Sequence, residues 1–249
     1  MAFEFVYGVQ PVLQVLTEKR RKAQKILLHR THLSPDLKRV LHIARKENVP
    51  IEEIDKHQLS QATQTTQHQG IAVKTEEYSY DTFDLLMHRL KQKKQGLVLV
   101  LDQIQDPQNL GAILRTALCA GADAVILPEK GSAQVTPAVM KASAGGAESV
   151  SVVLVPNLVP ALGALKKAGY WIFGAEASTS LTLWEADLQR NLGLVMGSEG
   201  VGIRNSIKKQ CDFLISIPVL GTISALNVSV STGILLYEVL RQRKNLKMP

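Results

Sequence analysis

The second half of this 249-residue sequence lacks histidine. All six histidines lie before residue 96, at His29, His32, His42, His57, His68 and His88. A Ser-His-Asp triad needs an imidazole as its base, and zinc sites commonly use histidine ligands. Residues 96–249 are therefore not expected to perform triad hydrolysis or zinc chemistry, and no metal is predicted.

Cysteine is scarce, and the sequence has no long apolar run. Cys119 and Cys211 are too few for a disulfide framework, and the apolar residues around them predict small buried thiols. A reducing, cytoplasmic setting is the resulting expectation. No stretch reaches the roughly 20 apolar residues of a membrane span, and the N-terminus does not resemble a secretory signal. We therefore expect a soluble protein that is not exported and has no membrane partner.

The net charge of +7 comes from the N-terminal region. Residues 1–46 hold ten Lys and Arg against three acidic residues, and the rest of the chain is neutral overall. Clustered Lys and Arg are typical of proteins that bind phosphate-rich partners, because they displace counterions from the phosphates. A well-solvated surface would have the same composition, so the charge alone leaves both interpretations open.

Helix-like and strand-like patterns alternate along the chain and predict two α/β domains. In the first domain, residues 1–75, the patterns predict helices at 9–18 and 35–46 and strands at 25–30, 49–54 and 69–73. Residues 76–95 are polar apart from one short amphipathic stretch and form the predicted linker. The second domain is expected to span residues 96–249.

Six short apolar runs in the second domain predict a mainly parallel sheet. Helical patterns separate most of these runs, which lie at 97–102, 124–128, 150–155, 170–176, 192–197 and 213–218. This alternation is typical of a sheet covered by helices on both faces. Ligands of such sheets bind beyond the carboxyl ends of the strands. The loops after Asp102, Gly197 and Pro218 are therefore the candidate site.

The loop after the first of these strands leads into a helix that carries two polar residues. Asp106 followed by Pro107 is a typical helix start, and Gly121 is a typical stop. Asn109 and Arg115 lie on either side of the polar face. Because helical side chains lean toward the N-terminus, both are expected to converge near the strand end. Taken alone, the segment favours a capped helix with an ordinary solvated arginine over a functional site.

The loop after the strand at 192–197 is rich in glycine. Gly197, Gly200 and Gly202 surround Glu199, and glycine allows positive φ and a close approach of the backbone to a ligand. A tight turn without a ligand is the alternative. The spacing is not the GxGxxG of dinucleotide-binding turns. This counts against a nicotinamide-dependent oxidoreductase and against a methyltransferase of the classical Rossmann type.

The third loop leads into a helix for which Ser224 is the predicted N-cap. Its first turns hold small and polar residues, namely Asn227, Ser229, Ser231, Thr232 and Gly233. These are unusual in a buried helix, because glycine costs about 1 kcal/mol there and hydroxyls compete for backbone hydrogen bonds. Tight packing, a dimer seam and a direct catalytic role are the interpretations that remain open.

In their order and spacing, these segments resemble the three motifs of the SpoU (TrmH-type) RNA ribose methyltransferases of the SPOUT superfamily. The matching stretches are DPQNLGAILRTA, MGSEGVGIR and IPVLGTISALNVSVSTG, and TPAVMKASAGGAE between them is also similar. The likeness covers residues 96–243. In the N-terminal domain, FVYGVQPVLQVL and HQGIAV are similar to the RNA-substrate-binding domain of bacterial 23S ribosomal RNA guanosine 2'-O-methyltransferases.

The resemblance implies an enzyme that uses S-adenosyl-L-methionine to methylate a ribose 2'-hydroxyl in RNA. A guanosine of 23S rRNA is the expected target, and a ribose of transfer RNA is the alternative. A non-catalytic RNA-binding or ribosome-assembly factor of the same fold is the alternative of another class. The resemblance also implies a trefoil knot at the C-terminus of the parallel-sheet domain, and a homodimer in which both subunits complete the site.

The resemblance further assigns residues to the site. Gly197, Ile217 and Leu226 would contact the cofactor through their backbone. The catalytic set would be Arg115, Asn109, Glu199, Ser229 and Asn227.

Arg115 is the strongest candidate to act on the ribose hydroxyl, which is a poor nucleophile until its proton leaves. Arginine stays protonated in nearly all sites, so a simple base role is awkward. Our hypothesis is that Arg115 pairs with an RNA phosphate and stabilises the developing alkoxide, while Asn109 and Ser229 orient it. Whether Arg115 also accepts the proton is left open.

Overall fold

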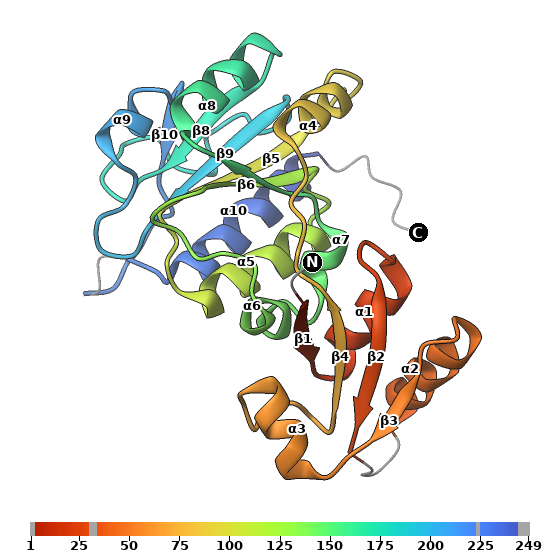
Figure 1. Ribbon diagram of the computed structural model, residues 1–249. Coiled ribbons are helices and arrows are strands. Elements are labelled where there is room, and N and C mark those ends of the chain that lie inside the picture. Colours follow the sequence, from red (N-terminus) through yellow and green to blue (C-terminus); the bar gives the residue numbers. More distant parts are fainter. Residues whose placement is uncertain (1–2, 30–33, 223–224, 244–249) are drawn as a thin grey trace. The chain divides into compact units, whose positions relative to one another are not determined.

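The computed structural model describes residues 3–29, 34–222 and 225–243 (Figure 1). By their contacts, the residues group into two compact units. Unit 1 comprises residues 1–79 with 134–149, and unit 2 comprises residues 80–133 with 150–249. Each unit has a sheet of its own.

Unit 1 is built on a four-stranded mixed sheet in the order β1-β4-β2-β3. Its strands are β1 (Phe3–Tyr7), β2 (Ala23–Leu28), β3 (Ile51–Glu53) and β4 (Ile71–Glu76). Its helices are α1 (Val9–Glu18), α2 (Pro35–Lys46), α3 (Lys56–Thr63), α6 (Pro137–Ala142) and α7 (Gly146–Ser149). Strand β4 is antiparallel to β1 and β2, whereas β2 and β3 are parallel.

The predicted elements of the N-terminal domain are confirmed in type and place, with small shifts of the strand ends. Helices α1 and α2 have the predicted bounds. Arg30, the last residue of the strand predicted at 25–30, lies outside the described residues. Two elements were not predicted, β1 and α3. The start of α3 has a readable sequence pattern, because Asp55 and Gln58 form a reciprocal capping box.

Unit 2 is built on a six-stranded parallel sheet in the order β10-β8-β9-β5-β6-β7, which confirms the predicted mainly parallel sheet. Its strands are β5 (Leu97–Asp102), β6 (Ala124–Pro128), β7 (Val152–Val155), β8 (Trp171–Ala175), β9 (Leu192–Gly197) and β10 (Phe213–Ile215). Every residue of β5 and β9 is buried. Continuous apolar runs of this kind belong to parallel strands that are covered on both faces.

Helices cover both faces of this sheet (Figure 1). Helices α4 (Phe83–Leu90), α8 (Leu158–Lys167) and α9 (Asn205–Lys208) pack on one face, where Leu86, Leu162 and Ile207 join a core with Val98 and Val195. Helices α5 (Pro107–Cys119) and α10 (Val228–Gln242) lie together on the other face. Helix α4 is the amphipathic stretch of the predicted linker. None of the helices in the described residues combines the length and apolar character that crossing a membrane would require.

The central strands β5 and β9 lie side by side, although about 90 residues separate them. Asp102 at the end of β5 pairs with Gly197 at the end of β9. Chain order runs outward from β5 to β6 and β7 on one side, and the later strands fill the other side. The two strand ends therefore meet where the winding changes direction, which is the usual ligand position in such sheets.

Neither cysteine is fully buried, and one segment of the expected second domain lies in unit 1. Cys119 is exposed rather than buried, because it ends α5 on the solvent side of the last turn. Cys211 is partly buried, and burial raises the pKa of its thiol to about 12. Residues 134–149 were expected in the second domain, yet their contacts lie with unit 1. The functional boundaries at residues 75 and 96 stay a prediction.

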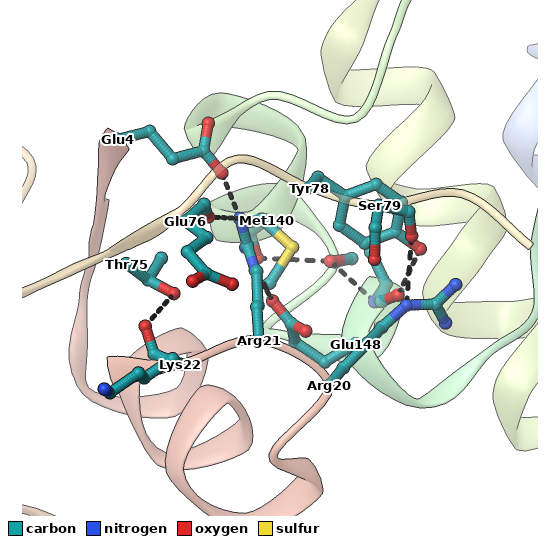
Figure 2. Close-up of polar contacts among 12 residues, drawn as sticks. Glu4, Arg20, Arg21, Lys22, Thr75, Glu76, Tyr78, Ser79, Met140 and Glu148 are labelled. Carbon is teal, nitrogen blue, oxygen red and sulfur yellow. Dashed lines mark hydrogen bonds and ion pairs between the residues drawn. The ribbon is translucent and has the colours of Figure 1, made fainter. Parts of the chain in front are cut away.

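A buried ionic cluster attaches α7 to the N-terminal part of unit 1 (Figure 2). Arg21 donates to Glu148 Oε1 from Nε at 2.8 Å and from Nη2 at 2.6 Å. Its Nη1 donates to the carbonyl of Glu76 at 3.0 Å and also contacts Glu4. The side chains of Arg21 and Glu148 are 1% and 0% exposed. Burial raises the pKa of Glu4 in spite of its pairing with Arg21.

We predict that Arg21→Met lowers the free energy of unfolding of unit 1 by about 3 to 5 kcal/mol, because Glu148 would be left as a buried charge without a partner. A urea titration followed by circular dichroism measures this loss. Lys25→Met is the matched control, since its pair with Glu52 is largely exposed and should contribute at most about 1 kcal/mol. Equal losses in the two variants would contradict the interpretation.

Candidate active site

Unit 2 contains a pocket at the carboxyl ends of β8, β9 and β10. Its volume is about 580 Å³, which is within the usual range of small-molecule sites. The strand ends and the loops after them form its walls, which include Met196, Ile215, Val219 and Ala225. The pocket therefore lies where the parallel sheet predicted a ligand.

All three residues predicted to contact a cofactor line this pocket, namely Gly197, Ile217 and Leu226. At Gly197 the backbone leaves no room for a side chain. An added Cβ would lie 2.1 Å from the carbonyl carbon of Gly202 and 2.2 Å from the nitrogen of Ile203. Glycine at this position lets the chain after β9 fold back against the strand end.

The chain after β9 forms a closed turn. The backbone of Ser198 donates to Gly202 at 3.2 Å, and Gly202 donates back to Ser198 at 2.9 Å. Gly200 and Gly202 have φ values of 87° and 71°, which residues other than glycine rarely adopt. The turn therefore depends on glycine at these positions, and it presents Glu199 at its tip.

Asp102 ties this turn to the neighbouring strand. It is fully buried and accepts two hydrogen bonds from Arg204, from the backbone nitrogen at 2.9 Å and from Nε at 2.8 Å. Sequence reasoning pointed to the loop after Asp102 but did not assign the residue itself to the site. Glu176 was also missed; it lines the pocket and forms an ion pair with Lys208. Both are acids at the end of an apolar run, and that pattern could have identified them.

Four of the five predicted catalytic residues form one hydrogen-bonded network. Asn109 Nδ2 donates to Glu199 Oε1 at 3.1 Å, and Asn227 Nδ2 donates to Asn109 Oδ1 at 3.0 Å and to Glu199. Ser229 Oγ donates to Asn227 Oδ1 at 2.6 Å. Three loops that are far apart in the sequence are thereby joined at one edge of the pocket.

The N-cap of α5 is confirmed, whereas that of α10 differs from the prediction. Asp106 accepts hydrogen bonds from the backbone of Gln108 and Asn109, with Pro107 at the first position. Ser224, predicted to cap the last helix, lies outside the described residues. Helix α10 begins at Val228, and Asn227 is its N-cap. Asn227 therefore has two roles, since its Oδ1 caps α10 while its Nδ2 joins the network.

Arg115 is not part of this network. It is exposed on α5 and pairs with no residue in the ranges 3–29, 34–222 and 225–243. It is six positions from Asn109, a separation of about 9 Å along the helix axis and about 120° around it. The predicted convergence of the two side chains is therefore not seen. The side chain of Arg115 is free to meet a ligand from outside.

Comparison with known proteins identifies the family. The model described as the SpoU rRNA Methylase family matches residues 96–237. The model described as RNA 2'-O ribose methyltransferase substrate binding matches residues 5–81. The chain belongs to the SpoU rRNA methylase family. This confirms the predicted family and, with it, the predicted enzyme class.

Relatives of known name are similar over most of the chain. The 23S rRNA (guanosine-2'-O-)-methyltransferase RlmB of Pseudomonas putida is 36% identical, and the match covers 97% of each protein. An uncharacterized tRNA/rRNA methyltransferase of Synechocystis is 39% identical, but this chain spans only 63% of its length.

Two solved structures are also similar. The SpoU methyltransferase AviRb from Streptomyces viridochromogenes, in complex with AdoMet, has a TM-score of 0.80 at 24% identity and covers 98% of this chain and 92% of its own. A TrmH/SpoU tRNA modifying enzyme from A. aeolicus has a TM-score of 0.55 at 29% identity and covers 66% of this chain and 85% of its own.

We predict that Gly197→Ala lowers the affinity of the pocket for S-adenosylmethionine roughly tenfold or more, because the added methyl group must push the 198–202 turn away from the strand end. Isothermal titration calorimetry measures the affinity. Gly163→Ala on α8 is the control, since its new methyl group would have no atom within 4 Å. That variant should bind normally and be at least as stable as the parent. Normal binding by Gly197→Ala would contradict the assignment of the pocket.

Proposed function

We propose that this chain transfers the methyl group of S-adenosylmethionine to the ribose 2'-hydroxyl of a guanosine in 23S ribosomal RNA. The observation that carries the proposal is the network of Asn109, Glu199 and Asn227 at the edge of the pocket. A protein that only bound RNA would not need three loops held together around a small-molecule pocket. The 36% identity to a 23S rRNA guanosine methyltransferase over 97% of each chain supports the choice of substrate.

The pocket suits S-adenosylmethionine in size and in chemistry. Apolar side chains such as Ile217 and Leu226 can hold an adenine ring, and the glycine turn after Gly197 exposes backbone groups for the polar parts. The sulfonium of this cofactor supplies an activated methyl group, which needs only alignment with an attacking oxygen. The protein's share of the reaction is therefore to position the RNA and to deal with the hydroxyl proton.

The network residues and Arg115 have different roles in this proposal. Asn109, Glu199, Asn227 and Ser229 hold the three loops in place around the pocket, as their mutual hydrogen bonds suggest. Arg115 is exposed and unpaired among the described residues, and its guanidinium offers five donors to an incoming phosphate or to a developing alkoxide. Asn109 and Arg115 are too far apart along α5 to support the hypothesis that Asn109 orients Arg115.

Methyl transfer from labelled S-adenosylmethionine to unmodified ribosomal and transfer RNA, followed by nucleoside mass spectrometry, tests the proposal. We expect 2'-O-methylguanosine in large-subunit RNA. Transfer RNA is the second candidate substrate, because the A. aeolicus neighbour modifies tRNA. If the wild-type chain methylates neither pool and does not bind S-adenosylmethionine, it is a non-catalytic RNA-binding or ribosome-assembly factor instead.

We predict that Arg115→Ala lowers kcat/KM about 100-fold or more, since a charged donor to the reacting oxygen is lost. Arg115→Lys should also lose at least about tenfold, because lysine cannot reproduce the planar fork of the guanidinium. The affinity for S-adenosylmethionine should not change in either variant. Arg190→Lys is the control, since Arg190 precedes β9 at the opposite end of the sheet. Near wild-type turnover by Arg115→Lys would exclude this role.

We also propose a trefoil knot, which the family resemblance implies, and a cytoplasmic location. Strand β10 lies at the edge of the sheet, yet α10 after it packs on α5, which follows the central strand β5. The chain must therefore cross β9 and its loop on the way back, which is compatible with a knot. The cytoplasmic location rests on the scarcity of cysteine and on the ribosomal substrate.

We also propose that the chain acts as a homodimer through α10 and α5. Val230, Ile234 and Tyr237 are spaced at i, i+4 and i+7 on α10 and are 50%, 38% and 54% exposed. Leu118 on the adjacent α5 is 38% exposed. An exposed apolar stripe of this kind marks an interaction surface. Because α10 starts at the network residue Asn227, a second copy on this stripe would lie beside the site.

We predict that Ile234→Glu together with Tyr237→Glu converts a dimer into a monomer, because two charges would be buried in the apolar seam. Sedimentation velocity measures the change of mass. Leu85→Glu on α4 is the control, since Leu85 is 51% exposed on the other face of the sheet. A wild-type chain that is monomeric at the concentrations where it is active would contradict the dimer.

A further inference from the structure

One edge of the sheet in unit 1 gathers the ends of three strands. The chain leaves β1 at Gly8 and β2 at His29, and it enters β4 at Gly70. The backbone of Gly8 donates to Ile71 at 3.0 Å, and that of His29 donates to Gly70 at 2.8 Å. Helix α3 reaches the same edge, where Ser60 Oγ and His68 Nε2 are 3.1 Å apart.

The ammonium group of Lys141 on α6 lies at this edge, close to Gly8 and Gln69. A Cβ added at Gly8 would lie 2.7 Å from Lys141 Nζ and 3.0 Å from Gln69 Oε1. Gly8 has a φ of 97°, so both the conformation and the space there require glycine. Lys141 is partly buried, and no carboxylate in the described part of the chain pairs with it.

Lys141 shares this neighbourhood with other basic groups. Burial lowers the pKa of the His68 imidazole, and the charges of Lys56, His29 and Lys141 lower it further. The parallel pairing of β2 with β3 sets Leu28 opposite Glu53, so His29 and Lys56, the first residue of α3, both follow strand ends on this side of the sheet. Burial also lowers the pKa of Lys141, because it removes water from the ammonium group. An anion placed beside this group would stabilise its charged form.

Lys141 is held in unit 1 by contacts of the segment that carries it. The buried pair of Arg21 and Glu148 fixes α7, and Tyr78 donates to the carbonyl of Ala147 at 2.8 Å (Figure 2). Between α6 and α7, a Cβ at Gly145 would lie 2.6 Å from Gln14 on α1. The segment is thus packed tightly against α1, and the position of Lys141 is fixed by several independent contacts.

We propose that Lys141, His29 and Lys56 form a binding site for RNA backbone phosphates on unit 1. The site would be composite, because Lys141 lies inside the methylase match at 96–237, whereas the substrate-binding match ends at residue 81. The proposal rests on the proposed function for the identity of the partner. Basic groups gathered at one place favour a polyanion there, because they gain affinity by displacing counterions from phosphates.

Equilibrium binding of the full-length chain to unmodified 23S ribosomal RNA, transcribed in vitro, tests the site over a range of salt concentrations. We expect Lys141→Gln and Lys56→Gln each to weaken binding about five- to tenfold near 0.1 M salt. Each should also reduce the slope of log K against log salt by about 0.7 to 0.9, the value of one phosphate contact. Lys141→Arg keeps the charge and should restore most of the affinity.

Lys46→Gln is the matched control. Helix α2 connects the parallel strands β2 and β3, so its last residue, Lys46, lies at the end of the sheet opposite to His29. Its loss should change affinity less than twofold. The proposed site would be overturned if Lys141→Gln had the same slope of log K against log salt as Lys46→Gln and its melting temperature were unchanged. The binding measurement does not depend on turnover. A chain that is inactive in methyl transfer would refute the proposed function, whereas the phosphate site on unit 1 would still be tested by RNA binding.

Discussion

The structure of the site depends on the parallel pairing of β5 with β9. This pairing sets Asp102 opposite Gly197, and the buried carboxylate of Asp102 then accepts two hydrogen bonds from Arg204. The ends of the five-residue turn between Gly197 and Ile203 are therefore fixed on both sides. Two hydrogen bonds between the backbones of Ser198 and Gly202 also close the turn, so it can hold Glu199 in only a few positions. The network to α5 and α10 follows from that constraint.

The elements that depend on local sequence could be predicted. The six strands of unit 2 appear as continuous apolar runs, because parallel strands are buried on both faces. The start of α5 could be read from Asp106 and Pro107, whose effect is confined to one helical turn. The gathering of the loops after Asp102 and Gly197 at one site also followed, since parallel strands bring their carboxyl ends to the same side of a sheet. In each case a short segment or a general rule of sheet geometry contains the information.

The features that could not be predicted depend on contacts between distant segments. Glu148 stands in a segment that looks like an ordinary helix, and a single glutamate is usually solvated. Its burial follows from Arg21, 127 positions earlier, and no local pattern connects the two. The missing convergence of Arg115 with Asn109 is a different case, because the angle of about 120° between them follows from helix geometry alone.

The pair of Arg21 and Glu148 joins two parts of the sequence that the family models assign to different domains. By sequence, residues 134–149 belong to the methylase match, whereas by contacts they belong to unit 1. A buried carboxylate is tolerated only with its partner, because removal of one charge leaves the other without water or counter-charge. A substrate-binding domain without a cation at position 21 would therefore leave Glu148 as a buried charge without a partner. The pair thus links the substrate-binding match to α7 of the methylase match, although neither Arg21 nor Glu148 lines the pocket.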